Sequence, residues 1–425
     1  MLLFFALVCS LPSPAIGDDD WTGWRGSRGD GTASGSPPVE WSEERNVRWK
    51  ADVPGFALSS PIVSGERVFV TTAVGTGTKR AGVVSEAFRE PYELEEQEFL
   101  VLAFERASGK ELWRKKVNQA MPHEPTHPTN SYATPTPVTD GTRVYCSFGS
   151  FGLFALDLAG NLVWQVDLGD MTNNGHGEGS SPILHAGHVI VLWGHWGASF
   201  LVALDAASGQ ERWRSPLPAG NNCSTPIVVH LESGDQIVVA GMQTSAFDPS
   251  SGKKLWSFGD AQTRGNTAMA SPVAISELVL VPGIDRNDLR ALVVLDEGEP
   301  AEVLWEKRSS DNIPSLLAYE QRLYFLKGDS GQLTVLDAAT GEVEYGPERL
   351  SGVIEVWASP VIAGGRLYVV GRDGKVEVLA TTPEVRTLAV NELADEFAAS
   401  PAVAGKELFL RGRERLYCIA EPAPK

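Results

Sequence analysis

The feature that most constrains this chain is an internal repeat of about 45 residues. In each unit a small or apolar residue and a proline precede a short apolar stretch, a turn and a β-type run, as in "SSPIVSGERVFV" and "ASPVIAGGRLYVV". The anchoring prolines are Pro61, Pro137, Pro182, Pro226, Pro272, Pro314, Pro360 and Pro401, spaced by 76, 45, 44, 46, 42, 46 and 41 residues. A fixed period of this size marks a repeat architecture, so we expect eight units, the first with an insertion at 74–98.

A second signature follows in most units: an apolar strand, Asp, a turn with Gly, and an aromatic residue, as in "ALDAASGQERW". Asp accepts the backbone hydrogen bonds that set a turn, and Gly takes the positive-φ position. The aromatic residues, interpreted as inter-blade packing groups, are Trp113, Trp164, Trp213, Trp256, Trp305 and Tyr345. Each period thus encodes four strands, which predicts an all-β fold, an eight-bladed β-propeller of four-stranded antiparallel blades.

The two ends of the chain complement each other. The eighth unit ends at "RLYCIAEPAPK" without its aromatic strand, whereas "NVRWKADV" carries Trp49 before the first unit. We therefore expect residues 46–53 to complete the last blade, with Trp49 as its docking residue. The predicted division is a signal peptide at 1–17, a lead segment at 18–40 and the propeller at 41–421.

The pattern A-x-D-x-x-[ST]-G-x-x-x-W resembles the repeat of pyrroloquinoline-quinone-like propellers and extends from about residue 41 to 420. Such propellers include the quinoprotein alcohol dehydrogenases and the scaffold lipoprotein of bacterial outer-membrane protein assembly. The lead "WTGWRGSRGDG" and the loop "NSYATPTPVTDG" are similar to exported bacterial members of the group. The resemblance is specific for fold, but one fold hosts many activities.

The resemblance implies that quinone-binding members use a Ca²⁺ held by carboxylate and amide oxygens, an Asp base and commonly two adjacent cysteines. This chain has no Cys-Cys pair, and six of its seven spacings lie between 41 and 46 residues, which leaves little room for a cofactor chamber. We expect no cofactor and no metal. Quinone with calcium remains the alternative, because scattered Glu, Asp and Asn residues could coordinate the ion.

Charge and the N-terminal residues bear on location and partners. The net charge of −18 disfavours nucleic acid and anionic membranes. The start "MLLFFALVCSLPSPAIG" predicts export to the periplasm or another extracytoplasmic space, and Val8 makes lipid anchoring at Cys9 unexpected. No later run approaches the ~20 apolar residues that span a bilayer. The expected partner is a protein or small extracytoplasmic ligand, and the chain is expected to be a monomer.

The letters HEPTH at 123–127 match the zinc-protease motif H-E-x-x-H. That chemistry needs both histidines on one helix, and Pro125 between them breaks a helix, so a loop is predicted. The cysteines beyond the signal peptide, Cys146, Cys223 and Cys418, have no zinc-like spacing and are interpreted as buried apolar groups. His185, His188, His195 and His230 are interpreted as surface or packed groups.

Loops that lead from an outermost strand to the next innermost strand open on one end of a propeller, which is a usual ligand surface. Polar residues in these loops are the candidate partner-binding residues: His127, Asn130, His176, Glu178, Asn222, Arg264, Asn266, Asp311 and Trp357. The alternative is that Asn and Asp only cap turns. His127, Asn130, His176 and Glu178 are the strongest candidates, since they lie in adjacent units and could bind a metal, a carbohydrate or a peptide.

The insertion at 74–98 is expected to be a solvated flap, with a partner-binding or channel-covering role as the alternative. No nucleophile motif is present, and the Ser residues before the anchors are interpreted as structural. The sequence therefore predicts an exported binding or scaffolding propeller without catalytic residues. A quinoprotein dehydrogenase of alcohols or sugars is the alternative, and a hydrolase or lyase is weaker.

Overall fold

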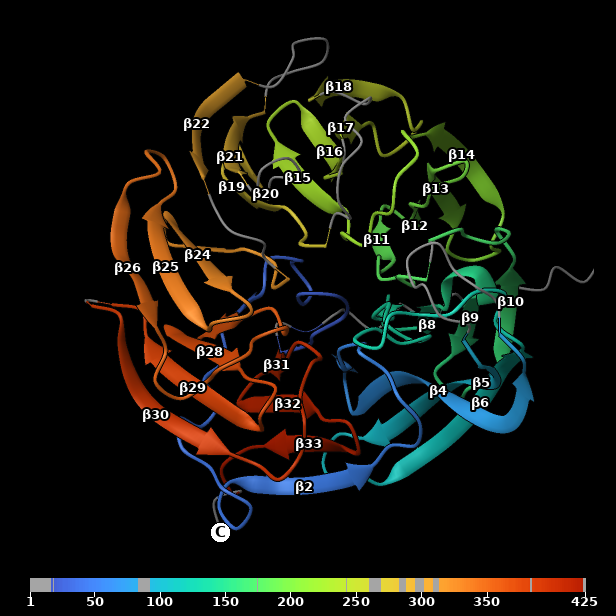
Figure 1. Ribbon diagram of the computed structural model, residues 1–425, viewed down its shortest axis with the longest axis horizontal. Coiled ribbons are helices and arrows are strands. Elements are labelled where there is room, and N and C mark those ends of the chain that lie inside the picture. Colours follow the sequence, from blue (N-terminus) through green and yellow to red (C-terminus); the bar gives the residue numbers. More distant parts are fainter. Residues whose placement is uncertain are drawn as a thin grey trace, which may run out of the picture.

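The computed structural model describes residues 17, 19–82, 92–173, 175–241, 243–259, 269–282, 288–294, 302–308, 313–382 and 384–422. These residues form eight sheets arranged in a ring around a common axis (Figure 1). Within each blade the chain runs outwards from the axis, and neighbouring strands of the repeat are antiparallel. The predicted eight-bladed β-propeller is confirmed.

The first four blades follow one another along the chain. Blade one contains β3 (Ile62–Ser64), β4 (Arg67–Arg80), β5 (Leu94–Glu105) and β6 (Glu111–Ala120). Blade two contains β7 (Val138–Thr139), β8 (Arg143–Ser147), β9 (Leu153–Asp157) and β10 (Leu162–Val166), with a short 3₁₀ helix η1 (Gly149–Phe151). Blade three contains β11 (Ile183–His185), β12 (His188–Trp193), β13 (Phe200–Asp205) and β14 (Glu211–Pro216). Blade four contains β15 (Ile227–Leu231), β16 (Gly234–Val239), β17 (Thr244–Phe247) and β18 (Lys254–Phe258).

The second half repeats the arrangement. Blade five contains β19 (Val273–Ile275), β20 (Leu278–Pro282), β21 (Asp288–Val293) and β22 (Glu302–Arg308). Blade six contains β23 (Leu317–Tyr319), β24 (Arg322–Lys327), β25 (Gln332–Asp337) and β26 (Val343–Arg349). Blade seven contains β27 (Val361–Ala363), β28 (Arg366–Val370), β29 (Lys375–Ala380) and β30 (Arg386–Glu392), joined by β1 (Thr32–Ala33). Blade eight contains β31 (Ala402–Ala404), β32 (Glu407–Arg411), β33 (Arg415–Ile419) and β2 (Val47–Asp52).

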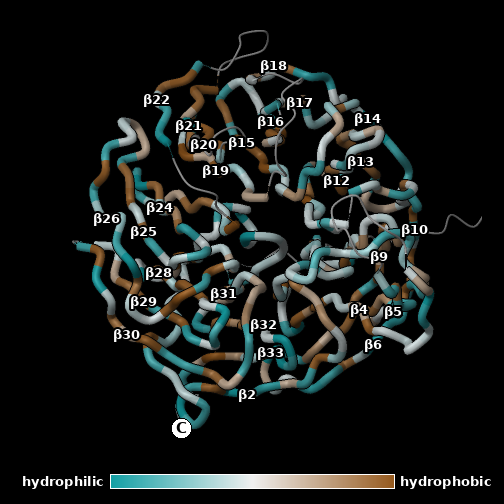
Figure 2. The backbone as a smooth tube through the Cα atoms, viewed as in Figure 1, coloured by the Kyte–Doolittle hydropathy of each residue, from teal (hydrophilic) through white to brown (hydrophobic). Residues whose placement is uncertain are grey.

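The core lies between blades and is built by their middle strands. The β8 strand is buried over its last four residues, whereas in β10 only Trp164 is buried. Figure 2 shows brown, apolar segments along the middle strands, and outer strands such as β22 and β30 carry some exposed apolar residues as well. Since both faces of a middle strand pack against neighbouring blades, these strands are apolar throughout instead of alternating.

Each outer-strand Trp docks on the next blade. The Trp113 indole N–H donates to the Leu158 carbonyl at 3.0 Å, within the turn that Asp157 closes by accepting two backbone N–H bonds. Gly160 in this turn has φ 85°, and a Cβ there would lie 2.8 Å from the indole ring. The turn therefore needs glycine both for its conformation and for the close approach of the ring.

Four further indoles repeat this bond to a neighbouring blade: Trp49 to Arg106, Trp164 to Ala206, Trp213 to Pro249 and Trp305 to Ala338. Trp256 instead donates to Gln236 Oε1 in its own blade. Tyr345 packs against the core between blades six and seven. In blade seven, Ala389 holds the equivalent register position opposite Val378.

Hydroxyl groups beside the anchors also link the blades. The backbone N–H of Ser60 donates to Thr136 Oγ1 at 2.9 Å, and the pattern continues blade by blade from Thr136 to Ser181, Thr225, Ser271, Ser315, Ser359 and Ser400. These Ser residues are structural, as expected. The pattern corrects one anchor: Leu317 pairs with Tyr324 as Ile62 pairs with Phe69, so Leu316, and not Pro314, is equivalent to Pro61.

The ends of the chain close the ring. The β2 strand pairs antiparallel with β33, so the predicted N-terminal completion of blade eight is confirmed. At this junction the Glu407 carboxylate lies between two guanidinium groups, those of Arg48 and Arg106. Arg106 also donates to the Ala404 carbonyl at 3.0 Å, which ties blade one to blade eight.

The lead segment is part of the propeller rather than a separate arm. The β1 strand pairs parallel with β27, and Trp21, 1% exposed, bridges to Val63 in β3. The Gly65 N–H, in the turn after β3, donates to Asp20 Oδ1 at 2.9 Å. The lead therefore covers the end of the axis at which the innermost strands turn outwards, and it leaves the opposite end to the inter-blade loops (Figure 1).

The insertion in blade one differs from the expected flap over its described part. Residues 74–80 lie in β4 and residues 94–98 in β5, so the insertion lengthens the central hairpin of the blade. Residues 83–91 lie outside the described residues. Across the described ranges, no helix is long and apolar enough to cross a membrane.

Candidate functional site

Two kinds of loop share the open end of the axis. One kind joins consecutive blades, and the other joins the second and third strands of a blade, because antiparallel strands alternate in direction. We call this end the rim. The predicted candidates come from loops of the first kind alone, whereas the recesses of the rim are built from both kinds.

Glu178 stands at the centre of one recess. Its carboxylate accepts bonds from the Ser150 N–H at 2.9 Å and the Ser150 hydroxyl at 2.5 Å, across the junction of an inter-blade loop and the η1 loop. Burial raises the pKa of Glu178 to about 7, because a carboxylate loses hydration there and the Ser150 bonds offset only part of the loss. A Cβ at Gly149, which has φ 55°, would lie 1.0 Å from Glu178 Oε2.

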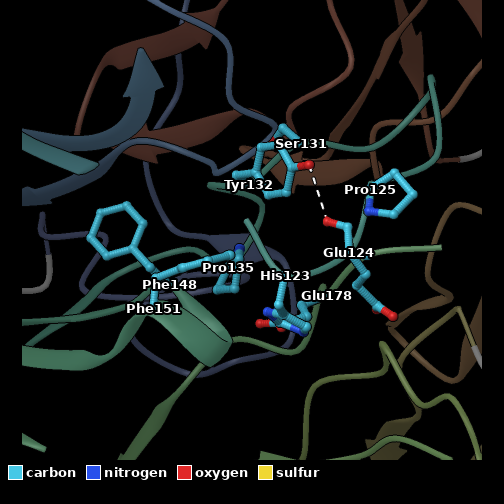
Figure 3. A pocket seen from close by; sticks show the side chains of 10 residues that line it. His123, Glu124, Pro125, Ser131, Tyr132, Pro135, Phe148, Phe151 and Glu178 are labelled. Carbon is cyan, nitrogen blue, oxygen red and sulfur yellow. Dashed lines mark hydrogen bonds between the residues drawn. The ribbon is translucent and has the colours of Figure 1, made fainter. Parts of the chain in front are cut away.

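The recess around this carboxylate is lined by polar and aromatic side chains. We call it the Glu178 recess: His123, Glu124, Tyr132, Phe148, Phe151 and Glu178 (Figure 3). The Tyr132 hydroxyl donates to the Glu124 carbonyl at 3.2 Å, and burial raises the pKa of Tyr132 to about 12. The cavity measures about 20 Å³, which is room for about one water molecule.

The four strongest candidates lie near one another, and of these Glu178 lines the recess. Asn130 donates to the His176 carbonyl at 2.9 Å, and the His127 and His176 rings stack with centroids 6.3 Å apart. Burial and the neighbouring His176 lower the pKa of His127. The loops are thus cross-linked by Asn130, while the Glu178 carboxylate accepts from Ser150 and lies near the His123 imidazole.

A metal does not fit this arrangement. Among the described residues, no group of three or more His, Cys, Asp or Glu side chains lies in a geometry that could hold an ion. In HEPTH, His123 Nε2 lies 2.8 Å from the Met171 carbonyl oxygen and His127 Nδ1 lies 2.6 Å from Thr129 Oγ1. The stretch is not helical, in agreement with the sequence prediction.

Of the remaining candidates, Asn222 lines a second small cavity together with Glu178, whereas Trp357 lies elsewhere on the rim. The Asn222 amide donates to the Ala240 carbonyl at 2.7 Å and accepts from Ser224, so it caps a turn of its own blade. Trp357 lies under the Arg372 guanidinium, 3.8 Å from its ring centroid. Arg264, Asn266 and Asp311 lie outside the described residues.

The sequence analysis missed a cross-link in the mid-blade loop of blade three. The Thr172 N–H donates to His195 Nδ1 at 3.0 Å, and the Trp196 N–H donates to the Thr172 carbonyl at 3.0 Å. Gly220 donates to the His195 carbonyl at 2.8 Å and joins the next inter-blade loop. Trp196 itself is 39% exposed. The letters GHWG between two strands were the available signal.

The family model described as "Outer membrane protein assembly factor BamB" matches residues 39–173, 94–258, 153–296 and 243–386. The chain belongs to this family of PQQ-like repeat propellers. No curated protein matches the chain. BamB from Moraxella catarrhalis has a similar structure, with a TM-score of 0.56 at 14% identity over 84% of this chain and 99% of that one.

Other solved propellers share the fold. The quinohemoprotein alcohol dehydrogenase from Comamonas testosteroni gives a TM-score of 0.62 at 11% identity, covering 96% of this chain and 81% of that one. The computationally designed Ika8 protein gives 0.54 at 11% identity, covering 81% and 98%. At these identities the likeness extends to fold alone, since enzymes and a designed chain share it.

The residues of the Glu178 recess do not fit a quinone cofactor. The cavity has room for about one water molecule, whereas the quinone is a multi-ring molecule. Cys146, Cys223 and Cys418 are free thiols in three different blades or loops, so no ring disulfide of adjacent cysteines can form. A Ca²⁺ ion takes six to eight oxygen ligands, and in the described part of the chain no three or more His, Cys, Asp or Glu side chains gather in a group that could hold an ion.

Proposed function

We propose that this protein is an extracytoplasmic binding propeller that holds a polypeptide partner on the rim of blades two and three. One observation carries the proposal: three loops cross-linked through Thr172, His195 and Gly220 present the exposed indole of Trp196. Exposed aromatic residues on a rigid surface are typical anchors of protein interfaces. The description of the family model as an outer membrane protein assembly factor supports an extracytoplasmic location and a protein partner.

The hydrogen bonds between the loops matter for affinity. A partner that binds loops already held in one conformation does not have to order them, so less of the contact energy is lost. Asn130, bound to the His176 carbonyl, extends the same cross-linking to the loop between blades one and two. The rim from His127 to Trp196 is therefore proposed as one continuous surface, and the protein acts as a monomer in this role.

The quinoprotein alternative has no observation in its favour beyond the shared fold. The Glu178 recess has room for about one water molecule, which favours the binding proposal over this alternative. Addition of pyrroloquinoline quinone with Ca²⁺, followed by absorbance and dye-linked alcohol oxidation, tests this directly. Stoichiometric quinone binding with alcohol oxidation would replace the binding proposal.

The test of the proposal is partner capture with matched variants. The tagged protein is used to capture partners from the extracytoplasmic fraction of its source cells, and Trp196→Ala and the double variant His176→Ala/Glu178→Ala are compared with wild type. The control is Leu162→Ala, since Leu162 is 43% exposed on an outer strand away from the rim. Loss of the wild-type partner with both rim variants but not with the control supports the proposal; equal capture by folded rim variants contradicts it.

A further inference from the structure

A second pocket on the rim lies between blades seven, eight and one. We call it the Arg411 pocket and define it by Phe56, Trp357, Arg372, Glu396, Arg411 and Arg413. Its cavity measures about 50 Å³, more than the volume that one water needs. In a chain of net charge −18, three guanidinium groups around one cavity are a local reversal of sign.

Arg411 is the unusual member of the pocket. It is 1% exposed, yet no carboxylate forms an ion pair with it among the described residues. Its Nη1 donates to the Thr71 carbonyl at 3.0 Å and its Nη2 approaches Thr72 Oγ1 at 3.4 Å, so the side chain crosses from blade eight to blade one. Its buried Nε–H has no acceptor within the described ranges of the chain. A buried charge with an unused donor is costly unless an anion completes it.

The nearby carboxylates do not supply that anion. Asp395 lies behind the pocket, where its oxygens accept the backbone N–H groups of Arg413 and Arg415 and the Tyr417 hydroxyl. Glu396 lies 3.8 Å from Arg413, and its side chain is 65% exposed. Burial lowers the pKa of Arg411 to about 10, and Asp395 offsets this only in part.

The remaining lining favours an organic ligand over an inorganic ion. Arg372 stacks on Trp357 at 3.8 Å and is held by Glu355 at 2.7 Å, while the Arg413 guanidinium lies 5.2 Å from the Phe56 ring centroid. Glu355 neutralises Arg372 and Glu396 partly offsets Arg413, which leaves an excess of about one positive charge. A carboxylate is a planar monoanion that matches the guanidinium fork, and the aromatic rings offer faces for the rest of the ligand.

We propose that the Arg411 pocket binds the carboxylate group of an organic anion, with Arg411 as its buried partner and Trp357 as the platform for the organic part. The carboxylate could belong to a free organic acid or to the C-terminus of a peptide, since both present the same group. The proposal does not depend on partner binding at Trp196. It adds a small-anion site beside the loop between blades one and two, since Pro128 and Thr129 of that loop also line the pocket.

The experiment measures binding of benzoate by calorimetry to the full-length protein, with neutral benzamide and inorganic sulfate as comparison ligands. Benzoate should bind at least about tenfold more tightly than benzamide, because a charge-assisted hydrogen bond to the carboxylate is lost in the amide. Arg411→Met and Arg413→Gln should each weaken benzoate binding about tenfold or more. The matched control is Arg214→Gln, since Arg214 lies 3.9 Å above Phe200 and pairs with Glu211 at 2.7 Å, outside the pocket.

Each outcome decides the proposal. If Arg411→Met does not fold, Arg413→Gln and Arg372→Gln carry the test, because both head groups reach the surface. Equal affinity for benzoate and benzamide, unchanged binding by the folded variants, or tighter binding of sulfate than of benzoate would overturn it. A peptide Gly-Gly-Phe with a free C-terminus, compared with its amide, identifies the source: preference for the free acid indicates a chain terminus, and binding of benzoate alone indicates a small acid. Loss of partner capture in Trp196→Ala with benzoate binding intact would show the two sites to be separate.

Discussion

The two sides of the rim use the same construction for opposite charges. In the Glu178 recess, an inter-blade loop and a mid-blade loop enclose a carboxyl group that no Lys or Arg of the described residues pairs with. In the Arg411 pocket, segments of blades seven, eight and one enclose a guanidinium with which no carboxylate of the described segments forms an ion pair. The repeated strands therefore fix where the recesses lie, while residues of the loops and strand ends, such as Glu178 and Arg411, decide what they present.

The most sensitive point of this comparison is the packing around Glu178. Gly149→Ala places a Cβ 1.0 Å from Glu178 Oε2 and imposes φ 55° on a residue with a side chain, so we expect a loss of about 3 kcal/mol in the free energy of unfolding. Urea denaturation of the purified variant measures it. Gly187→Ala is the control, since Gly187 has φ 78° but nothing within 4 Å of its Cβ position. Equal losses in both variants would show that backbone strain, and not the recess, sets the effect.

The charge of Glu178 should make the recess, but not the pocket, sensitive to pH near neutrality. Folding raises the pKa of Glu178 from 4.5 to about 7, so between these values the folded state holds more protons than the unfolded state. Stability attributable to Glu178 is therefore present below pH 4.5 and falls by up to about 3 kcal/mol as the pH rises through 7. Urea midpoints measured from pH 5 to pH 8 should fall in wild type, with a much smaller slope in Glu178→Gln. Parallel profiles of the two proteins would contradict a buried, protonated Glu178.

Binding should separate the two sides. We expect Trp196→Ala to weaken partner capture by about 2 kcal/mol, roughly thirtyfold, and to leave benzoate binding unchanged. Trp357→Ala should do the reverse, because its ring belongs to the Arg411 pocket. Calorimetry with benzoate and quantitative capture on the same preparations compare them. A folded variant that weakens both partner capture and benzoate binding would show that the two sites form one surface.

The smallest effect concerns the cross-link between loops at the recess. Asn130→Ala removes bonds to the His176 carbonyl and the Ser131 N–H, which should cost about 1 kcal/mol in unfolding free energy. Hydrogen exchange should show faster opening of residues 121–136 and unchanged exchange near Arg411. If hydrogen exchange changes equally in residues 121–136 and near Arg411, the rim moves as one unit, and the recess and the pocket are not independent.

Much of the fold could be predicted because the repeat is visible in the sequence. The regular spacing of the Pro and Trp residues predicted eight blades. Trp49, which precedes the first unit, predicted the strand that closes the ring, and Pro125 excluded a zinc-binding helix. The placement of one anchor at Pro314 was wrong. This proline lies two residues before the true anchor position, and the strand register shows that Leu316 occupies that position. The candidate site was predicted only in part: the loops around Asn130 and Glu178 meet, but Ser150 and Trp196 come from mid-blade loops that the repeat alignment did not examine.

What the sequence determined by itself is therefore the local, repeated part of this protein. Each blade is specified by residues close together in the chain, such as Asp157 and Gly160, which form the turn after β9. A single repeat therefore contains the information that specifies its own strands and turns. Only the tertiary structure decided the rest: that the lead segment with Trp21 covers one end of the axis, that Ser150 holds Glu178, and that Arg411 lies buried against Thr71 without an ion pair. These contacts join residues from different blades, and burial and charge at such places depend on the closed ring rather than on any one segment.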